Sequence, residues 1–326
     1  MTPISARYSF PSVKWLFFVA VANITVGIFL CFNSVTLAED ELLPPEQLSL
    51  NTSDGISLAV WYYPVPKDLT PKATVLVIHD MGGSHESVEP LSIGLQSSGY
   101  AVLAPDLRGH GESLITRNGK TVTTKTLRKP DVLAIAASTG GRIRHQARAR
   151  GDLETIFQWI DNRDDIDGLD KTRLCVVGCG DGATIGTLWT VADASWPAIT
   201  SGTQGGYVKA IALISPSLTA KSGVTMLPAL KTNLFRGSLP ILLLSGSGDR
   251  DARRLTDQLI QIRPKQWMIR GPGSKKDQAE EVESASDASV ICMQLNTSVA
   301  ADELAGDASA KVPSLVATFF DMALKR

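Results

Sequence analysis

Six continuous apolar runs, separated by segments of mixed polarity, dominate the pattern of this chain. They cover residues 74–78, 100–104, 173–177, 208–214, 240–244 and 266–269. Runs without alternation are typical of strands that are covered on both faces, and helices between such strands imply a mostly parallel sheet. Residues 47–51 and 56–63 flank a Ser53-Asp54-Gly55 turn and predict a hairpin before the first run. The pattern therefore predicts an α/β domain with eight strands.

Helical periodicity fills the segments between these runs. Apolar residues between 153 and 160 recur at helical spacing, and Asp152 and Glu154 suit the first turn of that helix. A final amphipathic helix is predicted at 314–324. With helices connecting parallel strands, we expect helices on both faces of the sheet.

The first 38 residues have a different pattern. Arg7 and Lys14 precede an apolar stretch at 15–32, and the small residues of Thr36-Leu37-Ala38 suit a cleavage point. The stretch fits a signal peptide, and its length also fits an uncleaved membrane anchor. We therefore expect an exported protein, periplasmic or extracellular, or one anchored to the membrane by its N-terminal helix.

The remaining residues, 39–326, are long enough for a single large domain. The formal net charge is −1, which argues against a nucleic-acid partner. Cys175, Cys179 and Cys292 are an odd set in this part of the chain, so they imply no disulfide framework. The pattern leaves the oligomeric state open.

A sharp strand-to-helix turn is predicted at Gly178-Cys179-Gly180-Asp181-Gly182. An apolar run precedes it and a helical segment follows, which is the context of the G-x-S-x-G nucleophile elbow of hydrolases. The middle position is Gly180, which tolerates a strained backbone but offers no nucleophilic atom. The sequence thus predicts a catalytic scaffold that has lost its nucleophile.

Three motifs in order along the chain resemble the α/β-hydrolase superfamily. His79-Asp80-Met81-Gly82-Gly83-Ser84 resembles the His-Gly oxyanion loop, with Asp80 where the family usually has glycine. Asp-Leu-Arg-Gly-His-Gly-Glu-Ser at 106–113 is similar to a loop of lysophospholipases, serine aminopeptidases and related esterases. The glycine-tipped elbow is the third motif. The resemblance implies the α/β-hydrolase fold, with serine aminopeptidases, lysophospholipases and dienelactone hydrolases as the nearest types.

The resemblance also implies roles for individual residues. His79 and His110 are expected to hold loops through hydrogen bonds to the backbone. Cys179 precedes the apex of the elbow, so it is expected to be a packing thiol rather than a substitute nucleophile. The oxyanion region and cleft give the candidate binding residues, which are His79, Gly82, Gly83, Cys179 and Asp181.

The family places nucleophile, acid and histidine in that order along the chain. Asp249 occupies the acid position and also suits a helix N-cap. The histidine is expected after the eighth strand, taken as 266–269, and Ser274 stands there instead. The chain has four histidines, and none follows residue 145. Gly180, Asp249 and Ser274 are therefore predicted to be vestiges of a triad.

Two segments with biased charge are predicted as insertions, near 114–150 and 275–311. Nine basic residues and one acidic residue lie between 117 and 150, whereas eight acidic residues and no basic residue lie between 277 and 307. Both segments follow strands that end at the edge where family active sites lie. The two segments fit two solvated loops. They also fit a lid in which the basic segment pairs with the acidic segment across the site.

Loss of nucleophile and base favours binding over catalysis. Enzymes without triad members keep a rate about 10³- to 10⁴-fold above that in water, against rate losses on the order of 10⁶. We expect a degenerate hydrolase homologue that binds a small molecule, lipid or protein in the old cleft, without a metal or cofactor. An ester or peptide hydrolase with an unconventional nucleophile and a structural envelope protein are the alternatives.

Overall fold

The computed structural model describes residues 42–325 except 67–68, 115, 118–119, 138–143, 145–150, 238, 265–266, 271–281 and 283–287. The chain divides into two units, Met1–Glu41 and Leu42–Arg326, and every described residue belongs to the second. The predicted signal or anchor at 1–38 therefore lies outside the described residues. Within the described part, no helix has the length and apolar character needed to cross a membrane.

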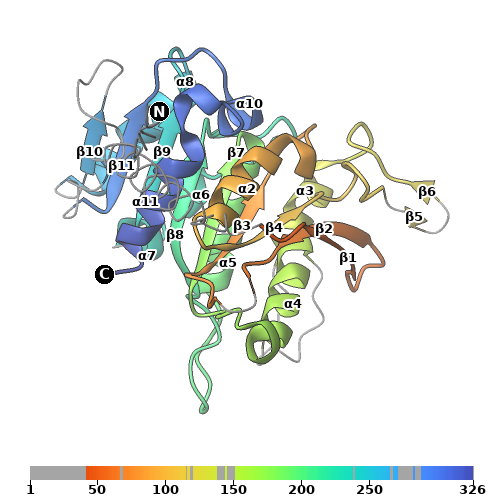
Figure 1. The fold of residues 1–326 in the computed structure, drawn as a ribbon. Helices are drawn as coiled ribbons and strands as arrows, with labels where there is room; N and C mark the ends of the chain where they lie inside the picture. Colours follow the sequence, from red (N-terminus) through yellow and green to blue (C-terminus); the bar gives the residue numbers. More distant parts are fainter. Residues whose placement is uncertain are drawn as a thin grey trace, which may run out of the picture. The chain divides into compact units, whose positions relative to one another are not determined.

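A nine-stranded sheet forms the centre of the second unit (Figure 1). Its strands in chain order are β1 (Glu46–Asn51), β2 (Ser57–Tyr63), β3 (Thr74–Ile78), β4 (Ala101–Pro105), β7 (Leu174–Cys179), β8 (Val208–Ile214), β9 (Ile241–Ser245), β10 (Trp267–Arg270) and β11 (Val290–Gln294). Their order across the sheet is β1-β2-β4-β3-β7-β8-β9-β11-β10. The pairs β1–β2 and β2–β4 are antiparallel, and the pairs from β4 onward across the sheet are parallel.

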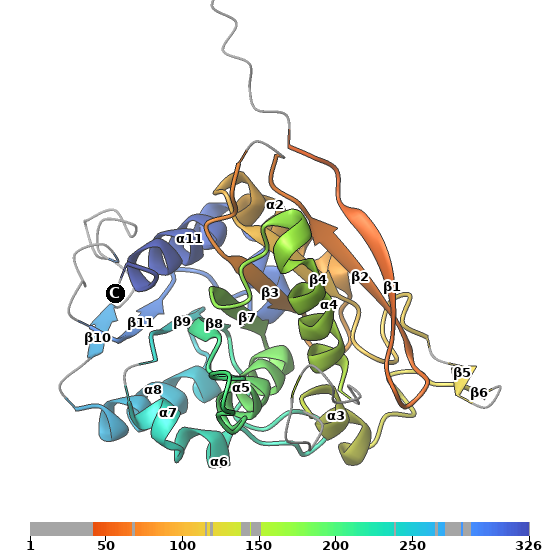
Figure 2. The same ribbon diagram turned by 90° about the horizontal axis from the view of Figure 1, so that it is seen from below.

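Helices cover both faces of the sheet (Figure 2). On one face lie α2 (Glu89–Ser97), α10 (Ala301–Ala305) and α11 (Val312–Ala323), and on the other lie α3 (Lys129–Ile135), α4 (Asp152–Asp167), α5 (Asp181–Ala194) and α8 (Arg250–Ile262). The short elements are η1 (His85–Val88), α6 (Leu227–Leu230), α7 (Asn233–Arg236), η3 (Ala308–Ala310) and the hairpin of β5 (Thr116–Arg117) and β6 (Lys120–Thr121). Each face therefore has its own hydrophobic layer.

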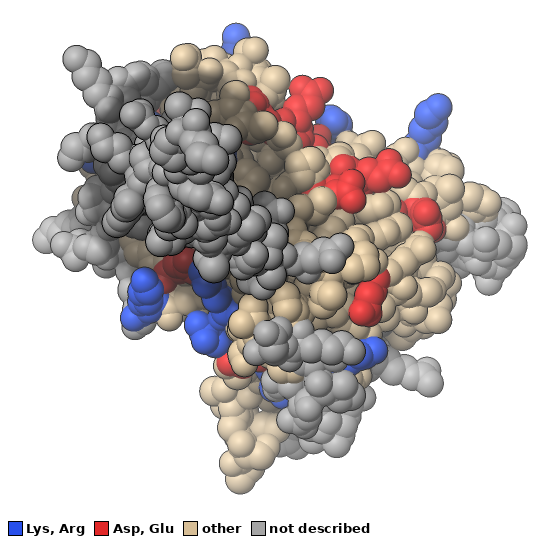
Figure 3. Space-filling model, in the orientation of Figure 1, with Lys and Arg blue, Asp and Glu red and all other residues tan. Residues whose placement is uncertain are grey.

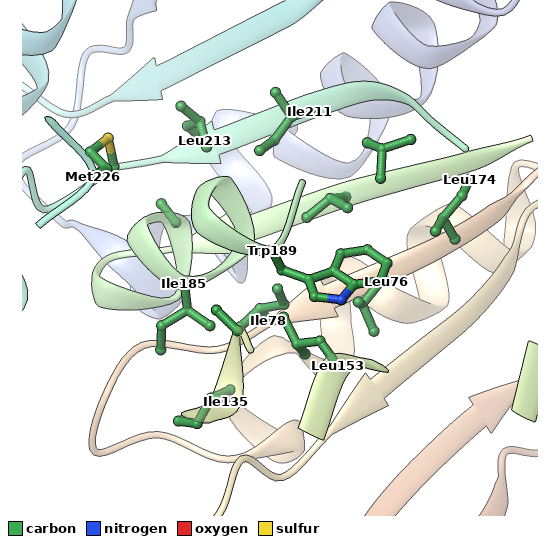
Figure 4. Packing of buried hydrophobic residues seen from close by; sticks show 14 of the residues in the cluster. Leu76, Ile78, Ile135, Leu153, Leu174, Ile185, Trp189, Ile211, Leu213 and Met226 are labelled. Atoms are coloured by element: carbon green, nitrogen blue, oxygen red, sulfur yellow. The ribbon is translucent and has the colours of Figure 1, made fainter. Parts of the chain in front are cut away.

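The core explains why the central strands are continuous apolar runs. All five residues of β3, β4 and β9 are buried. On the face covered by α4 and α5, Trp189 of α5 packs between Leu76 of β3 and Leu153 of α4 (Figure 4). Alternate residues of the same strands enter the second layer with α2 and α11. Strands buried on both faces have no polar side to alternate with, as the sequence indicated.

The predicted fold class is confirmed, and one strand changes its assignment. The predicted strand at 266–269 is found as β10, but it lies at the edge of the sheet, outside β11. β11 pairs directly with β9 and was not predicted. The range 275–311, expected to be an insertion, contains β11 and α10. The eighth position in the sheet therefore belongs to residues 290–294.

Candidate functional site

The predicted elbow is present at the end of β7. Gly180 lies between β7 and α5 with φ 54° and ψ −120°, a backbone conformation that strongly favours glycine. Packing at the turn is tight on both sides. A Cβ atom on Gly178 would lie 2.5 Å from Ala183 Cα, and one on Gly182 would lie 2.6 Å from Ile78 O. The glycine spacing of the motif therefore has a steric cause here.

The carboxylate of Asp80 occupies the space that a side chain at position 180 would need. A Cβ atom on Gly180 would lie 2.5 Å from Asp80 Cγ and closer still to Asp80 Oδ1. Asp181 N, at the start of α5, donates a hydrogen bond of 2.7 Å to that same Oδ1. In an elbow with a nucleophile, the amide after the nucleophile helps to form the oxyanion hole. Asp80 thus fills the nucleophile's place and binds an oxyanion donor.

Asp80 is held at both its backbone and its side chain. Asp80 N donates to Asp302 Oδ1 at 2.8 Å, and Ser87 Oγ donates to Asp302 Oδ2 at 2.6 Å. Burial raises the pKa of Asp302. A side chain on Gly83 would collide with Asp302, so the glycine leaves room for this carboxylate. Asp302 of α10 therefore fixes the loop that carries Asp80.

Cys179 has the properties of a packing thiol. It is fully buried in the layer beneath α11. Burial, followed by the nearby carboxylates of Asp302 and Asp80, raises the pKa of Cys179 well above its usual value. Since the thiolate is the reactive form, this side chain is a poor nucleophile at neutral pH. The expectation that Cys179 packs in the core agrees with this placement.

The described histidines are engaged in local structure. His79 is buried, its Nδ1 contacts Asp80 O at 2.6 Å, and its Nε2 accepts a hydrogen bond from Leu107 N at 3.1 Å. Burial lowers the pKa of His79 to about 4. The ring is therefore neutral at pH 7, with the proton on Nδ1.

Of the other two described histidines, His110 lies in the loop after β4, and His85 begins η1 after β3. Nδ1 of His110 bonds Arg108 O at 3.0 Å, and burial lowers the pKa of His110. His85 stacks on Trp61 with ring centroids 3.2 Å apart, and its Nδ1 lies 3.1 Å from Asp106 Oδ1. His145 is outside the described residues.

The acid position holds an aspartate, which serves as a helix cap. Asp249 is the N-cap of α8, and its Oδ1 accepts a hydrogen bond from Ala252 N at 2.9 Å. It follows β9 and reaches the same cavity as Gly180. The two predicted vestiges therefore converge at one edge of the sheet.

The histidine position needs a correction. Because β11 pairs with β9, the loop after β11 holds the place that Ser274 was expected to hold. That loop reads Leu295-Asn296-Thr297-Ser298-Val299-Ala300 and contains no histidine. Ser274 itself lies outside the described residues.

A polar cavity of about 510 Å³ lies above the elbow. Loops after β8, β9 and β11 form most of it, and Asp80 after β3 and Gly180 after β7 complete it. The described lining is Asp80, Gly180, Ser215, Pro216, Ser217, Gly246, Ser247, Gly248, Asp249, Arg250, Asp251, Ser298, Val299, Ala300 and Ala301. Ser215 and Ala301 adopt positive φ values of 42° and 49° without being glycine. Such backbone strain clusters at functional sites.

The candidate binding residues surround this cavity rather than line it. His79, Gly82, Gly83, Cys179 and Asp181 are not among the lining residues, whereas Gly180 and Asp249 are. Asp181 Oδ2 accepts a hydrogen bond from Lys221 N at 2.9 Å, so this side chain is used to hold the chain between β8 and α6.

Sequence reasoning missed Asp80, Ser215 and the loop after β11 as parts of the site. A signal for Asp80 was present in the sequence. A side chain is missing at position 180, and one has been gained at position 80, where the family usually has glycine.

Each of the two biased segments contains a charged residue with a structural role. Arg144 is buried and donates to Glu154 Oε1 at 2.8 Å, to Glu154 Oε2 at 2.9 Å and to Asp193 Oδ1 at 2.5 Å. Its guanidinium carbon also lies 3.7 Å from the ring centroid of Phe157. Asp302, from the acidic segment, binds the loop of Asp80 instead. Each of these charges pairs with the body of the domain.

No ion pair joins the two segments among the residues that the structure describes. On the face in Figure 3, described acidic and basic side chains form small groups with uncharged surface between them. Within the described ranges, no group of three or more His, Cys, Asp or Glu residues is placed to hold a metal ion. The described residues thus give the lid hypothesis no support.

Comparison with known proteins agrees with this geometry. The model of the alpha/beta hydrolase family matches residues 75–320, more than half of the chain. A search of curated protein sequences finds no match.

Several solved structures are similar in fold. One is an esterase of Pyrococcus furiosus, at 15% identity and a TM-score of 0.53, covering 85% of this chain and 90% of the esterase. Another is a thermophilic carboxylesterase from a metagenomic library, at 14% identity and a TM-score of 0.52, covering 89% and 92% of the two chains. A third is carboxyl esterase 2 of the fungus Tuber melanosporum, at 14% identity and a TM-score of 0.51, covering 90% and 88%. With the family match, the elbow and the sheet order, the chain belongs to the alpha/beta hydrolase family.

Proposed function

We propose that this chain is an exported, catalytically degenerate member of the family that binds a small polar molecule in the cavity above Gly180. The observation that carries the proposal is the carboxylate of Asp80 in the space of the missing nucleophile. Asp80 Oδ1 already binds Asp181 N, so that amide is not free to stabilise an oxyanion. Export is supported by the sequence of residues 1–38 alone.

The surroundings of the elbow support loss of catalysis. A nucleophile of this kind needs an adjacent base to activate it. The base position after β11 has no histidine, and the ring of His79 is held by backbone groups at both nitrogens. Gly180→Ser alone would place a hydroxyl against Asp80 without a histidine to activate it.

The cavity supports the binding part of the proposal. Its volume of about 510 Å³ lies within the range of small-molecule sites, roughly 300 to 1,000 Å³. Its lining is rich in serine, glycine and charged residues, which favours a polar molecule over a lipid. Its walls are also fixed. Ser217 N donates to Gly180 O at 3.1 Å, and Leu218 N donates to Asp251 Oδ2 at 3.2 Å.

Native mass spectrometry of the protein purified from its own host tests this proposal. We expect the wild-type chain to retain a small molecule, and Ala300→Trp to lose it, because Ala300 is an exposed residue of the cavity lining. Ala194→Trp is the matched control, since Ala194 is exposed at the end of α5 and is not a lining residue. Equal retention by both variants, or wild-type protein that binds nothing under any purification, would count against a binding role for the cavity.

A further inference from the structure

The cavity lining carries more negative than positive charge. Its described lining has three carboxylates, of Asp80, Asp249 and Asp251, and one guanidinium, of Arg250. Asp249 Oδ1 and Asp251 Oδ2 are each bound by a backbone amide. Opposite charges are favoured where a cleft carries an excess of one sign. The lining therefore favours a ligand with positive charge.

The same region has two helix N-termini, which ordinarily attract anions. Each of them is already occupied by a carboxylate of the chain. Asp80 Oδ1 accepts from Asp181 N in the first turn of α5, and Asp249 caps α8. A further anion would meet these carboxylates before the helix dipoles, so an anionic ligand is disfavoured.

Asp80 Oδ2 is an acceptor in the cavity that has only a long-range ion pair within the described part of the chain. Among the described residues it pairs with the ammonium group of Lys221, at a distance of 3.8 Å. The side chain of Lys221 is 77% exposed, so solvent screens this pair. An ammonium group from a ligand would enter a less exposed position beside the same oxygen. Lys221 is therefore a weak internal occupant that a ligand can replace.

A buried hydroxyl provides an independent sign of a ligand. Ser215 is 7% exposed, it lines the cavity, and its Oγ has no hydrogen-bond partner among the described residues. A buried polar atom without a partner costs about 1 to 3 kcal/mol. A hydrogen-bond donor placed beside this hydroxyl would remove this cost. Ammonium groups have three such donors.

We propose that the ligand carries a primary ammonium group, which binds Asp80 Oδ2 in place of Lys221. This inference rests on the proposed binding function and narrows it to cationic amines. Asp80 is preorganised for the role, because Asp302 holds its backbone amide and Asp181 N holds its other oxygen. The remaining volume of the cavity, with the hydroxyls of Ser217, Ser247 and Ser298 in its lining, suits a short polar body attached to the amine.

Isothermal titration of the whole chain with 1,5-diaminopentane tests the inference. The matched probes are 1,5-pentanediol and glutarate, which have the same carbon chain length but a neutral or a negative end. We expect the diamine to bind at least about fivefold more tightly than either probe, since a close ion pair in partly screened surroundings contributes on the order of 1 kcal/mol or more. Affinity for the diamine should also fall as salt rises.

Two variants locate the binding group. Asp80→Asn keeps the shape and an acceptor for Asp181 N but removes the charge, and we expect at least about a fivefold loss of diamine affinity. Lys221→Met removes the competing cation, and we expect affinity to rise by about twofold or more. The controls are Glu46→Gln and Lys231→Met, at exposed positions outside the cavity, which should change nothing.

The outcomes separate this inference from the proposed function. Tighter binding of the diol or glutarate, or a diamine affinity that Lys221→Met lowers, would overturn the cationic ligand while leaving a binding cavity. Absence of binding by all three probes would also overturn it. If Asp80→Asn fails to fold, the sign of the Lys221→Met effect still decides the question.

Discussion

At the scale of single residues, the carboxylate of Asp80 occupies the space that a side chain at position 180 would need. The turn at Gly180 keeps the positive φ of an elbow, and the carboxylate of Asp80 stands where its side chain would extend. A charged side chain beside a buried turn costs free energy unless it is hydrogen-bonded, so packing alone does not account for Asp80 at this place. Asp181 N provides that bond. The two positions therefore act as one unit.

A double-mutant cycle tests this coupling. Gly180→Ala should lower the free energy of unfolding by about 2 to 4 kcal/mol, because it adds backbone strain and displaces the carboxylate. In an Asp80→Gly background, the same change should cost about 1 kcal/mol less, since the collision is gone. Urea denaturation measures all four proteins.

Gly168→Ala is the control for backbone strain alone, because Gly168 has φ +66° and open space around its missing Cβ. Its cost should be the same in both backgrounds. Equal costs of Gly180→Ala in both backgrounds would show that the two sites are independent.

At the scale of elements, the sequence predicted the strands whose surroundings are uniform. β3, β4, β7, β8 and β9 lie between two hydrophobic layers, so each reads as an unbroken apolar run. The elbow was also predictable, because its glycines are required by close contacts that any such turn makes.

β11 was not predictable by the same reasoning. Its five residues, Val-Ile-Cys-Met-Gln, form a short run next to a strongly acidic stretch, and charge bias hid it. Pairing order across the sheet depends on contacts between strands far apart in the chain, which a local pattern does not carry. The wrong order moved the expected histidine position to Ser274. The approach of the Asp80 carboxylate to Gly180 is likewise a contact between residues 100 positions apart in the sequence.

Arg144 shows how one buried charge fastens a segment to two helices. It binds Glu154 of α4 and Asp193 of α5. Arg144→Met should lower the free energy of unfolding by about 3 to 5 kcal/mol, because both buried carboxylates lose their partner. Arg128→Met, at an exposed position, should change it by less than about 0.5 kcal/mol. Thermal and urea unfolding at pH 7 measure both variants, and a small effect of Arg144→Met would mean that water or another cation replaces the guanidinium.

At the scale of the whole molecule, the chain has the architecture of the alpha/beta hydrolase family, with a carboxylate at the centre of its cavity. Sheet order, elbow and acid position place Gly180 and Asp249 on the same cavity, as in a family active site. The carboxylate at the centre and the loop without histidine after β11 favour holding a molecule over transforming it. The scaffold supplies a rigid polar cavity whose walls are tied by hydrogen bonds.

Turnover of a p-nitrophenyl ester by the purified chain tests the central claim most directly. The measurement compares the wild type with Asp80→Asn and Asp249→Ala across a range of ester concentrations. We predict that all three give the same slow, non-saturating rate, because no described group is arranged as nucleophile and base. Saturable turnover by the wild type that either substitution abolishes would contradict the claim and make this cavity an active site.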